Sequence, residues 1–275
     1  MLWAGLFFSF MNLGVKLLPD LPVLEIVFFR ATIMVVITLI LLRKHRINPF
    51  GNNKPLLILR GLLGVTALSL YFYSLQHMPL ASAVTIMQLS PIFTTLLAII
   101  ILKEEIKPVQ LLFFLISFIG VIFIKGFDTR ISLPLFLIAI SGSVLSALAY
   151  NIVRKLKDTE QPLVVVFYFP FIAAPLSGIY TAFNFVMPTG FEWLILFLIG
   201  LSTQIAQVNM TKALQLERIE KVSIVRYLTI LYAIIYSYLF FDESYNIYTL
   251  IGMLLVVAGI VLNLFYKRKV SISKK

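Results

Sequence analysis

The segment VLEIVFFRATIMVVITLILL, residues 23–42, decides what kind of protein this is. Its twenty residues form one apolar run with only two charged side chains, Glu25 and Arg30. A helix needs about 20 apolar residues to cross the hydrocarbon core of a bilayer, so we predict a transmembrane helix here. The strands of a membrane barrel alternate apolar and polar residues over about ten positions, and this run does not alternate.

Runs of the same kind fill the rest of the chain, which has 275 residues, of which 60% are hydrophobic and 13% are charged. A soluble domain would be about 25% charged, and no polar stretch here is long enough to fold as one. We therefore predict an all-α polytopic membrane protein with ten transmembrane helices. The predicted spans cover residues 2–18, 23–42, 56–76, 79–102, 108–125, 133–153, 163–184, 191–213, 220–241 and 245–266.

The excess of positive charge follows the predicted topology. The chain has 23 Lys and Arg against 12 Asp and Glu, a net charge of +11. Seventeen of the 23 fall in connections on one side of the membrane and three on the other, and such an excess marks the cytoplasmic side. We expect an integral protein of the bacterial inner (plasma) membrane with both termini and a basic tail, 271–275, in the cytoplasm. Its expected partners are membrane lipid and a small-molecule substrate rather than nucleic acid.

The chain contains an internal repeat. One constant shift along the sequence, without gaps, superposes five predicted helices on the other five. It aligns Asn12 with Asn151, Lys16 with Lys155, Phe28 with Phe167, Gly61 with Gly200, Ala67 with Ala206, Gln76 with Gln215, Glu104 with Glu243 and Gly120 with Gly259. Because five is odd, the second repeat enters the membrane from the opposite side, as in alternating-access transporters. We predict repeats over 1–127 and 132–270 that rock about their seam.

Short patterns recur at equivalent places in the two halves. They are Leu89-Ser90-Pro91-Ile92-Phe93, Lys103-Glu104, Ile119-Gly120-Val121, Phe241-Asp242-Glu243, Ala258-Gly259-Ile260 and, in the second span, Glu25-Ile26-Val27-Phe28-Phe29-Arg30. Together with the ten helices and the inverted repeat, they resemble the EamA family of the drug/metabolite transporter superfamily over nearly the whole chain. The resemblance implies a secondary transporter of small metabolites, often an exporter, with a central cavity and a substrate that differs between members.

Some of these residues are expected to serve as hinges or structural elements. They are Pro91, Glu104, Glu243, Gly120 and Gly259. Pro91 removes one helical hydrogen bond, and we expect a kink there; its repeat counterpart is Ile230, so only the fourth span carries the break. Each of the two acids can cap a helix N-terminus, and each glycine lets two helices approach closely.

Two arginines within the predicted spans are the strongest candidates for substrate binding. Arg30 lies about 12 Å and Arg226 about 9 Å from the start of its helix, at 1.5 Å per residue. Ionisable groups at such depth are functional candidates, and an arginine matches a carboxylate or phosphate with two hydrogen bonds. The alternative for both is a structural role, in which the side chain bonds to backbone carbonyls or extends its charged end to the interface. Arg60, close to the cytoplasmic surface, is expected to extend its charged end to the interface.

Other polar side chains at plausible depth complete the candidate substrate site. They are Asn12, Tyr71, Gln88, Asn151, Gln207, Asn209 and Tyr227. For each, a hydrogen bond between helices or ordinary packing is the competing interpretation. No cofactor or metal is expected, because cysteine is absent and the two histidines lie at helix ends.

The sequence thus predicts a secondary active transporter, not an enzyme. The expected cargo is a small organic metabolite, amino-acid-like or anionic and carboxylate-bearing, and the expected direction is export. The alternative is a proton-coupled efflux pump for cationic or lipophilic drugs, which needs a carboxylate buried near the midplane; the first helix offers Asn12 instead. An enzyme is disfavoured because the catalytic patterns H-E-x-x-H and G-x-S-x-G are missing. Coupling to a proton gradient and a homodimer are left open.

Overall fold

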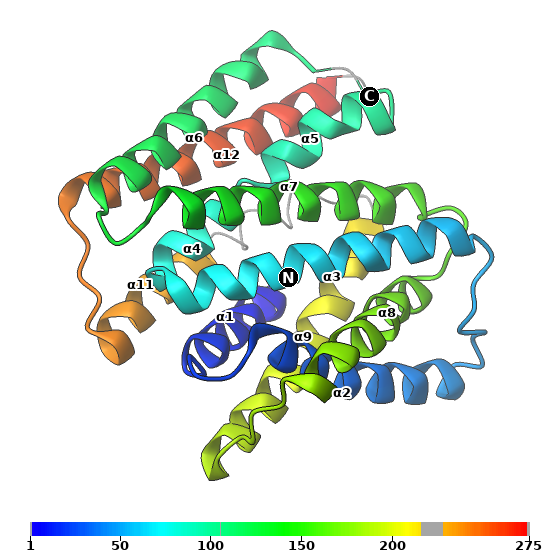
Figure 1. The fold of residues 1–275 in the computed structure, drawn as a ribbon. Coiled ribbons are helices and arrows are strands. Elements are labelled where there is room, and N and C mark those ends of the chain that lie inside the picture. Colours follow the sequence, from blue (N-terminus) through cyan, green and yellow to red (C-terminus); the bar gives the residue numbers. More distant parts are fainter. Residues whose placement is uncertain (1, 105, 216–227, 274–275) are drawn as a thin grey trace.

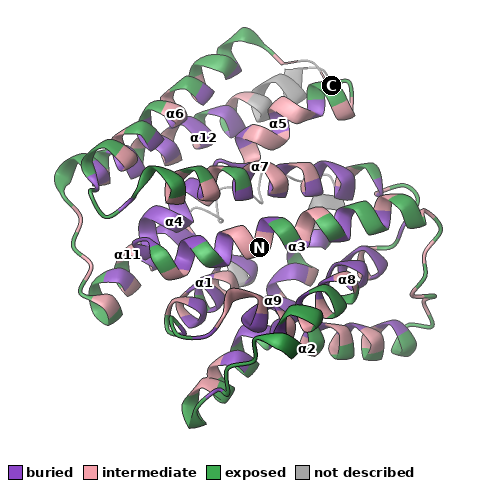
Figure 2. Ribbon diagram, in the orientation of Figure 1, coloured by how far each residue is buried: buried purple, intermediate pink, exposed green. Residues whose placement is uncertain are grey.

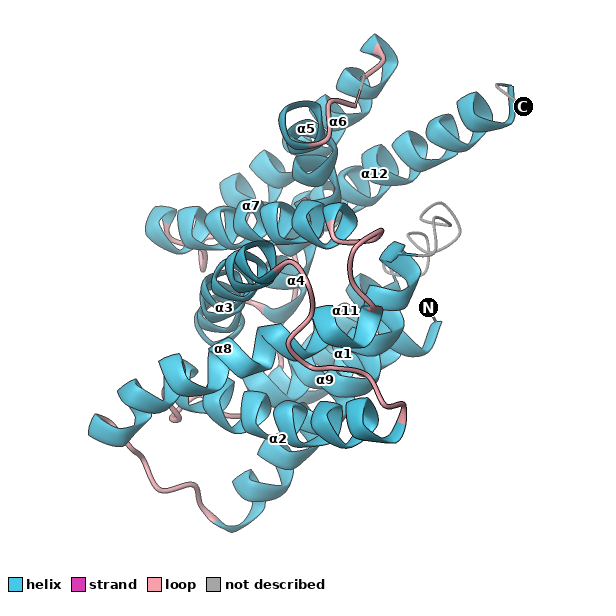
Figure 3. Ribbon diagram, turned by 90° about the vertical axis from the view of Figure 1, so that its right-hand side faces the viewer, coloured by secondary structure: helices cyan, strands magenta, loops and turns pink. Residues whose placement is uncertain are grey.

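The protein is helical throughout the part that the structure describes. The computed structural model describes residues 2–104, 106–215 and 228–273, and Figure 3 shows helices and loops but no strand among them. The helices are α1 (Leu2–Lys16), α2 (Val23–Lys44), α3 (Lys54–His77), α4 (Leu80–Met87), α5 (Ser90–Ile101), α6 (Pro108–Phe127), α7 (Leu133–Lys155), α8 (Pro162–Phe183), α9 (Gly190–Gln215), α11 (Leu228–Phe241) and α12 (Ile247–Ser273).

The predicted fold class is confirmed: the described helices follow the ten predicted spans, with α4 and α5 as the two parts of the fourth. Eight spans are long and apolar enough to cross a membrane, and α11 is a shorter apolar helix. The fourth span is broken because α4 ends at Met87, four residues before Pro91. A proline ring clashes with the carbonyl four residues earlier, so the break lies one turn before the proline itself.

The two repeats pack as a pair related by an approximate two-fold axis. The repeat shift maps α1 to α7, α2 to α8, α3 to α9, the α4–α5 pair to α11, and α6 to α12. The contacts follow the same exchange: α3 packs on α7 as α9 packs on α1, and α3 packs on α8 as α9 packs on α2. Three equivalent pairs, α2 with α8, α4 with α11 and α6 with α12, pack on each other. With five spans in each repeat, these contacts give the inverted arrangement.

Two close approaches of helices show that this symmetry holds residue by residue. Gly61 of α3 lies against Ile172 of α8, and Gly200 of α9 lies against Ile33 of α2. The repeat shift carries each member of one contact onto a member of the other. A Cβ at either glycine would collide with the isoleucine side chain, so glycine is needed for these helices to come so close.

The predicted close-packing glycines lie where α6 meets α12. A Cβ on Gly120 would lie 2.7 Å from the backbone nitrogen of Val256, and one on Gly259 would overlap Ser117. The Ser117 hydroxyl also donates a hydrogen bond to the carbonyl of Val256 (3.2 Å), its counterpart in the other repeat. Backbones this close leave no room for side chains.

The helices run between two ends of the molecule. Figure 1 places the connections from α6 to α7 and from α11 to α12 on the left, and those from α2 to α3 and from α7 to α8 on the right. We call the first the Glu243 end, after the acid between α11 and α12, and the second the Glu104 end, after the acid between α5 and α6, which pairs with Arg154 near the end of α7. Equivalent turns share one conformation, since the repeat counterparts Lys103 and Asp242 both have positive φ values, of 55° and 49°.

The buried faces of the helices meet in the middle of the bundle. In Figures 1 and 3, α6 and α12 lie at one edge and α2 at the opposite side, with α7 and α3 between them. Figure 2 shows buried residues on the faces that the helices turn toward each other and exposed residues on the outside. Large apolar side chains are exposed there, among them Ile100 (79%), Leu254 (67%) and Ile122 (66%), as on a surface that faces lipid.

Candidate functional site

A cavity of about 130 Å³ lies between the two repeats. Its walls come from α1, α2, α3 and α4 of the first repeat and from α7, α8, α9 and α11 of the second. The residues that line it are Ala4, Gly5, Phe8, Met11, Asn12, Arg30, Arg60, Gly64, Ala67, Leu68, Tyr71, Val84, Met87, Gln88, Ser146, Ala149, Tyr150, Phe169, Gln207, Met210 and Thr229. No Asp or Glu is among these described residues.

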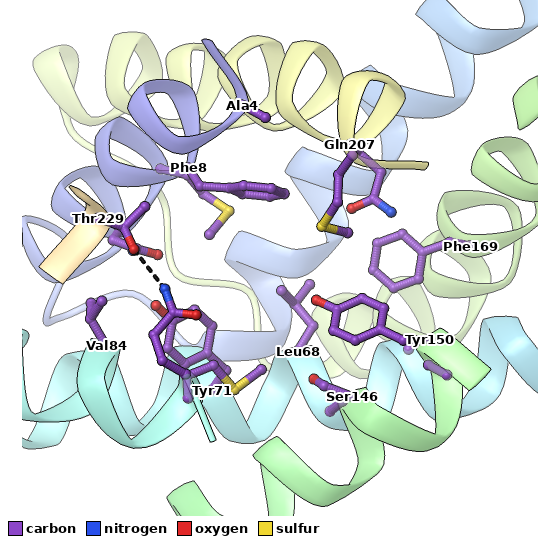
Figure 4. A pocket seen from close by; sticks show the side chains of 18 of the residues that line it. Ala4, Phe8, Leu68, Tyr71, Val84, Ser146, Tyr150, Phe169, Gln207 and Thr229 are labelled. Carbon is purple, nitrogen blue, oxygen red and sulfur yellow. Dashed lines mark hydrogen bonds between the residues drawn. The ribbon is translucent and has the colours of Figure 1, made fainter. Parts of the chain in front are cut away.

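The cavity extends from the middle of the bundle toward the Glu104 end. Ala4 lies near the start of α1 and Arg60 near the start of α3, and both of these helices begin at that end. Tyr150 of α7 and Gln207 of α9 lie in the later parts of helices that finish there. Figure 4 shows the side chains of Tyr150, Phe169 and Gln207 gathered on one side of the space.

Five of the nine predicted substrate-site residues line this cavity. They are Arg30, Asn12, Tyr71, Gln88 and Gln207. Arg226 and Tyr227 lie outside the described residues. The remaining two are placed elsewhere: the Asn151 amide donates to the carbonyl of Thr94 (3.0 Å), and the exposed Asn209 amide donates to the carbonyl of Ile205 (2.8 Å) of its own helix.

Arg30 is held in a fixed orientation inside the bundle. Its side chain is 2% exposed, and its Nε donates a hydrogen bond to the Thr203 hydroxyl (3.2 Å). That hydroxyl in turn donates to the backbone carbonyl of Ile199 (2.6 Å). The guanidinium carbon lies 5.8 Å from the ring centre of Phe72 and 5.1 Å from that of Phe169. Nη1 has no hydrogen-bond partner among the described residues, so its N–H donors are left unused by the protein.

Arg60 corrects our sequence interpretation. We expected its charged end to extend to the membrane surface, but the residue is 4% exposed and lines the cavity. Its guanidinium carbon lies 4.7 Å from the centre of the Phe169 ring. The error came from judging depth by distance along the helix, because Arg60 follows the start of α3 by only two turns. The side chain turns inward toward the aromatic ring instead of outward.

Uncharged polar groups complete the lining. The Gln88 amide donates to the Thr229 hydroxyl (2.8 Å), which joins α4 to α11 across the seam, as the dashed line in Figure 4 shows. Asn12 is 5% exposed, and its Oδ1 has no hydrogen-bond partner in the described part of the chain. The site can therefore both donate and accept hydrogen bonds, while its positive charge comes from Arg30 and Arg60.

A compact polar cluster joins the repeats at the Glu243 end. Glu243 accepts hydrogen bonds from the backbone N–H of Leu80 (2.9 Å), from the Ser237 hydroxyl (2.7 Å) and from the Tyr245 hydroxyl (3.0 Å). It also pairs with Lys16 (3.2 Å). Glu243 thus caps α4 of the other repeat rather than α12, the helix that follows it. Together Lys16, Leu80, Ser237, Glu243 and Tyr245 form what we call the Glu243 cluster.

Burial and charge shift two pKa values beside this cluster. Burial raises the pKa of the Tyr245 hydroxyl, and the neighbouring Glu243 carboxylate raises it further. The hydrogen bond to Asp128 (2.8 Å) raises the pKa of Arg130, whose guanidinium also donates to the carbonyl of Ser244 (3.0 Å). Both side chains therefore hold their protons at neutral pH, and the loops at this end are linked through neutral Tyr245 and charged Arg130.

Sequence reasoning missed Phe169 and Thr203 as well as the inward direction of Arg60. Phe169 is the repeat counterpart of Arg30, so the internal alignment already pairs the two positions across the seam. Thr203 corresponds in the same way to Gly64. In neither pair does residue type alone reveal which side chain turns inward. Among the described residues, no group of three or more His, Cys, Asp or Glu is placed to hold a metal ion.

Comparison with known proteins identifies the family to which this fold and cavity belong. The EamA-like transporter family matches residues 1–126 and 133–265. The chain is 31% identical over 264 residues to the pseudopaline exporter CntI of Pseudomonas aeruginosa, covering 94% of this chain and 93% of that protein. It is 33% identical to human solute carrier family 35 member G1, covering 94% of this chain and 76% of that protein.

Two further matches are more distant. An S-adenosylmethionine uptake transporter of Rickettsia felis is 26% identical over 252 residues, covering 91% of this chain and 85% of that protein. A protein of known crystal structure is 20% identical and matches with a TM-score of 0.68, covering 96% of this chain and 98% of the solved chain. At that identity the solved structure supports the shared fold alone. The named relatives move different molecules, one outward and one inward.

Proposed function

The chain belongs to the EamA-like transporter family, and from that premise we propose that it exports a small organic metabolite bearing a carboxylate or another anionic group by alternating access. It is an integral membrane protein and a transporter, not an enzyme. The observation that carries the anionic cargo is the cavity between the repeats, where Arg30 presents an unpartnered Nη1 and no described acid forms part of the wall.

The residues proposed to contact the substrate are those that line the cavity with polar groups. Arg30 would bind the anionic group with paired hydrogen bonds, the geometry that guanidinium and carboxylate share. Asn12, Gln88 and Gln207 would fix polar atoms of the substrate, and Tyr71 would pack against its apolar part. Arg226 and Tyr227, beyond the described residues, stay in the proposal on their predicted depth, while Asn151 and Asn209 are assigned to links within the protein.

The proposed orientation places the Glu104 end in the cytoplasm. The excess of Lys and Arg in the connections at that end supports this orientation, which also places both termini in the cytoplasm. The cavity would then be turned toward the cytoplasm, where an exported metabolite is collected. A bacterial inner membrane and the export direction are supported by the named Pseudomonas exporter, whose length the chain nearly matches. We propose repeat boundaries at 1–127 and 132–270.

Comparing the metabolites released by cells with and without the protein tests this function. We expect the medium of expressing cells to accumulate at least one acidic metabolite, and Arg30→Gln to reduce this release by about tenfold or more, since a hydrogen bond to a charged group contributes about 1.5–3 kcal/mol. The matched control is Arg43→Gln, which removes an exposed charge from the same helix and should leave release unchanged.

Two results would contradict the proposal. Release that is the same for Arg30→Gln and the parent protein, at equal amounts of folded protein, would remove Arg30 from the substrate site. Release of organic cations instead of acids would favour the drug-efflux alternative. That alternative has less support, because its chemistry needs a carboxylate facing the cavity and the described lining holds none.

A further inference from the structure

The cavity holds a second buried guanidinium that the proposed function does not use. Arg60 is 4% exposed, and its Nε and Nη1 have no hydrogen-bond partners among the described residues. Its guanidinium carbon and that of Arg30 lie 4.7 Å and 5.1 Å from the centre of the same Phe169 ring. Two positive groups from different helices therefore meet at one aromatic side chain.

The chain is shaped locally to hold Arg60 in this place. Gly64 follows it by four residues on α3, so both lie on one face of the helix. A Cβ at position 64 would come within 2.7 Å of Arg60 Nη1 and within 2.7 Å of Phe169 Cδ2. Real Cβ contacts are not that short, so a side chain here would displace the guanidinium or the ring. Glycine at this position leaves room for Arg60 to lie against Phe169.

Two buried guanidiniums need negative charge nearby. A charge taken out of water costs several kcal/mol even after the protein relaxes, and contact with an aromatic face offsets about 0.5–2 kcal/mol of it. No Asp or Glu is among the described lining residues. Glu25, the acid buried in α2, points elsewhere, because its Oε2 accepts the backbone N–H of Val186 (3.0 Å) in the loop before α9.

We propose that Arg30 and Arg60 together form a site for a substrate with two negative charges, of which short dicarboxylates are the simplest members. One carboxylate would bind the unpartnered Nη1 of Arg30, and the other would bind the unpartnered Nη1 of Arg60, on the edge of the guanidinium that Nη1 shares with Nη2. The apolar chain between them would lie against Phe169. This inference rests on the proposed function, and it specifies the charge of the cargo and adds Arg60 as a specificity-determining residue.

Matched pairs of ligands test how many negative charges the site prefers on its substrate. The purified full-length protein in detergent is heated with succinate or glutarate, and separately with the monoamides succinamate and glutaramate, which keep the length and lose one charge. A ligand at free concentration L that binds the folded state stabilises it by RT ln(1 + L/Kd), so affinities follow from how the melting temperature rises with ligand concentration. We expect each dicarboxylate to bind at least about tenfold more tightly than its monoamide, since a hydrogen bond to a charged group is worth about 1.5–3 kcal/mol.

Variants then assign the preference to Arg60. We expect Arg60→Gln to bind dicarboxylate and monoamide about equally, with the monoamide affinity unchanged because Arg30 still binds its single carboxylate. Gly64→Ala, which keeps the charge and displaces the guanidinium, should weaken the preference without removing it. Arg43→Gln is the matched control and should keep the full preference. The ratio of two affinities measured on one variant does not depend on how stable that variant is.

Three outcomes would overturn the inference. In the first, the parent protein binds the monoamides as tightly as the dicarboxylates. In the second, Arg60→Gln keeps the full preference for dicarboxylates. In the third, neither set of probes shifts the melting temperature. None of these results touches the proposed function, whose own test is the release of metabolites and its dependence on Arg30. Conversely, loss of that release with a retained dicarboxylate preference would leave the two-arginine site as a binding site without export.

Discussion

Glu243 and Glu104 occupy equivalent positions in the two repeats, yet their surroundings differ. Glu243 is 12% exposed and accepts three hydrogen bonds besides its ion pair with Lys16. Glu104 is 37% exposed and pairs with Arg154 of α7. The backbone around them is alike, since the N–H of Glu243 bonds to the carbonyl of Ser237 (3.0 Å) as that of Glu104 bonds to the carbonyl of Ala98 (3.2 Å). The contrast therefore lies in side chains and packing.

Part of the difference between Glu243 and Glu104 comes from the residues around them and does not depend on conformation. Ser237 and Tyr245, which donate to Glu243, have Ala98 and Ile106 as their counterparts in the first repeat. The side chains of these apolar residues cannot donate a hydrogen bond to Glu104 in any state of the transporter. An inverted repeat thus gives both ends the same backbone, while the side chains favour closure at the Glu243 end. The cavity lies toward the other end, in agreement with this preference.

The largest effect is expected when the Glu243 carboxylate loses its charge. Glu243→Gln keeps the shape of the side chain but weakens the bonds to Lys16, Leu80 and Tyr245, and a hydrogen bond to a charged group contributes about 1.5–3 kcal/mol. We expect the Glu243 end to open at least about tenfold more often. The measurement is labelling of Leu68→Cys, a cavity position in a chain without native cysteine, by an impermeant thiol reagent added at the Glu243 side.

Glu104→Gln in the same Leu68→Cys background is the matched comparison. Because Glu104 is more exposed, we expect its change to alter labelling from the Glu104 side by no more than about twofold, the scale of an exposed ion pair. Equal responses of the two variants would show that the two ends are held equally firmly. The proposed difference between the two acids would then be wrong.

A smaller effect is expected when the Glu243 end receives the side chains of the Glu104 end. The double variant Ser237→Ala with Tyr245→Ile removes two neutral donors and keeps Lys16 and the Leu80 backbone bond. A neutral hydrogen bond contributes about 1 kcal/mol, so labelling of Leu68→Cys from the Glu243 side should rise less than in Glu243→Gln. Tyr238→Ile, at a tyrosine of α11 that is 73% exposed, is the control. If the double variant is labelled as fast as Glu243→Gln, the hydroxyl groups and not the charge hold this end closed.

The same contrast explains how far sequence reasoning could reach. Apolar runs and the internal repeat predicted the spans and their pairing, because both depend on backbone length and burial, which the repeats share. The break after Met87 was one turn from the expected position, since the ring of Pro91 acts on the carbonyl four residues before it. These features follow from local chemistry and need no knowledge of the partner helices.

The candidate site was only partly predictable, because side chains do not follow the repeat. Asn12 lines the cavity, whereas its counterpart Asn151 binds the carbonyl of Thr94. Arg30 was identified from its depth, but depth gave the wrong result for Arg60, whose inward direction depends on Gly64 and on a ring in another helix. Such directions are set by tertiary contacts that residue type and spacing do not encode.

The smallest expected effect concerns the proton on Tyr245. Burial and then the Glu243 charge raise the pKa of its hydroxyl above the ordinary value of about 10. A raised pKa in the folded state means that Tyr245 contributes stability below about pH 10, and that this contribution is lost as the pH rises from there through the raised pKa. Ile106, the counterpart of Tyr245 at the other end, has no proton to lose, so alkaline pH should weaken the bonds of Tyr245 in the Glu243 cluster without an equivalent loss at Glu104. We expect the melting temperature of the parent protein to fall more steeply above about pH 10 than that of Tyr245→Phe, while Tyr238→Phe follows the parent. Parallel curves for the parent and Tyr245→Phe would show that Tyr245 titrates as an ordinary exposed tyrosine, and that its bond to Glu243 adds little to closure at this end.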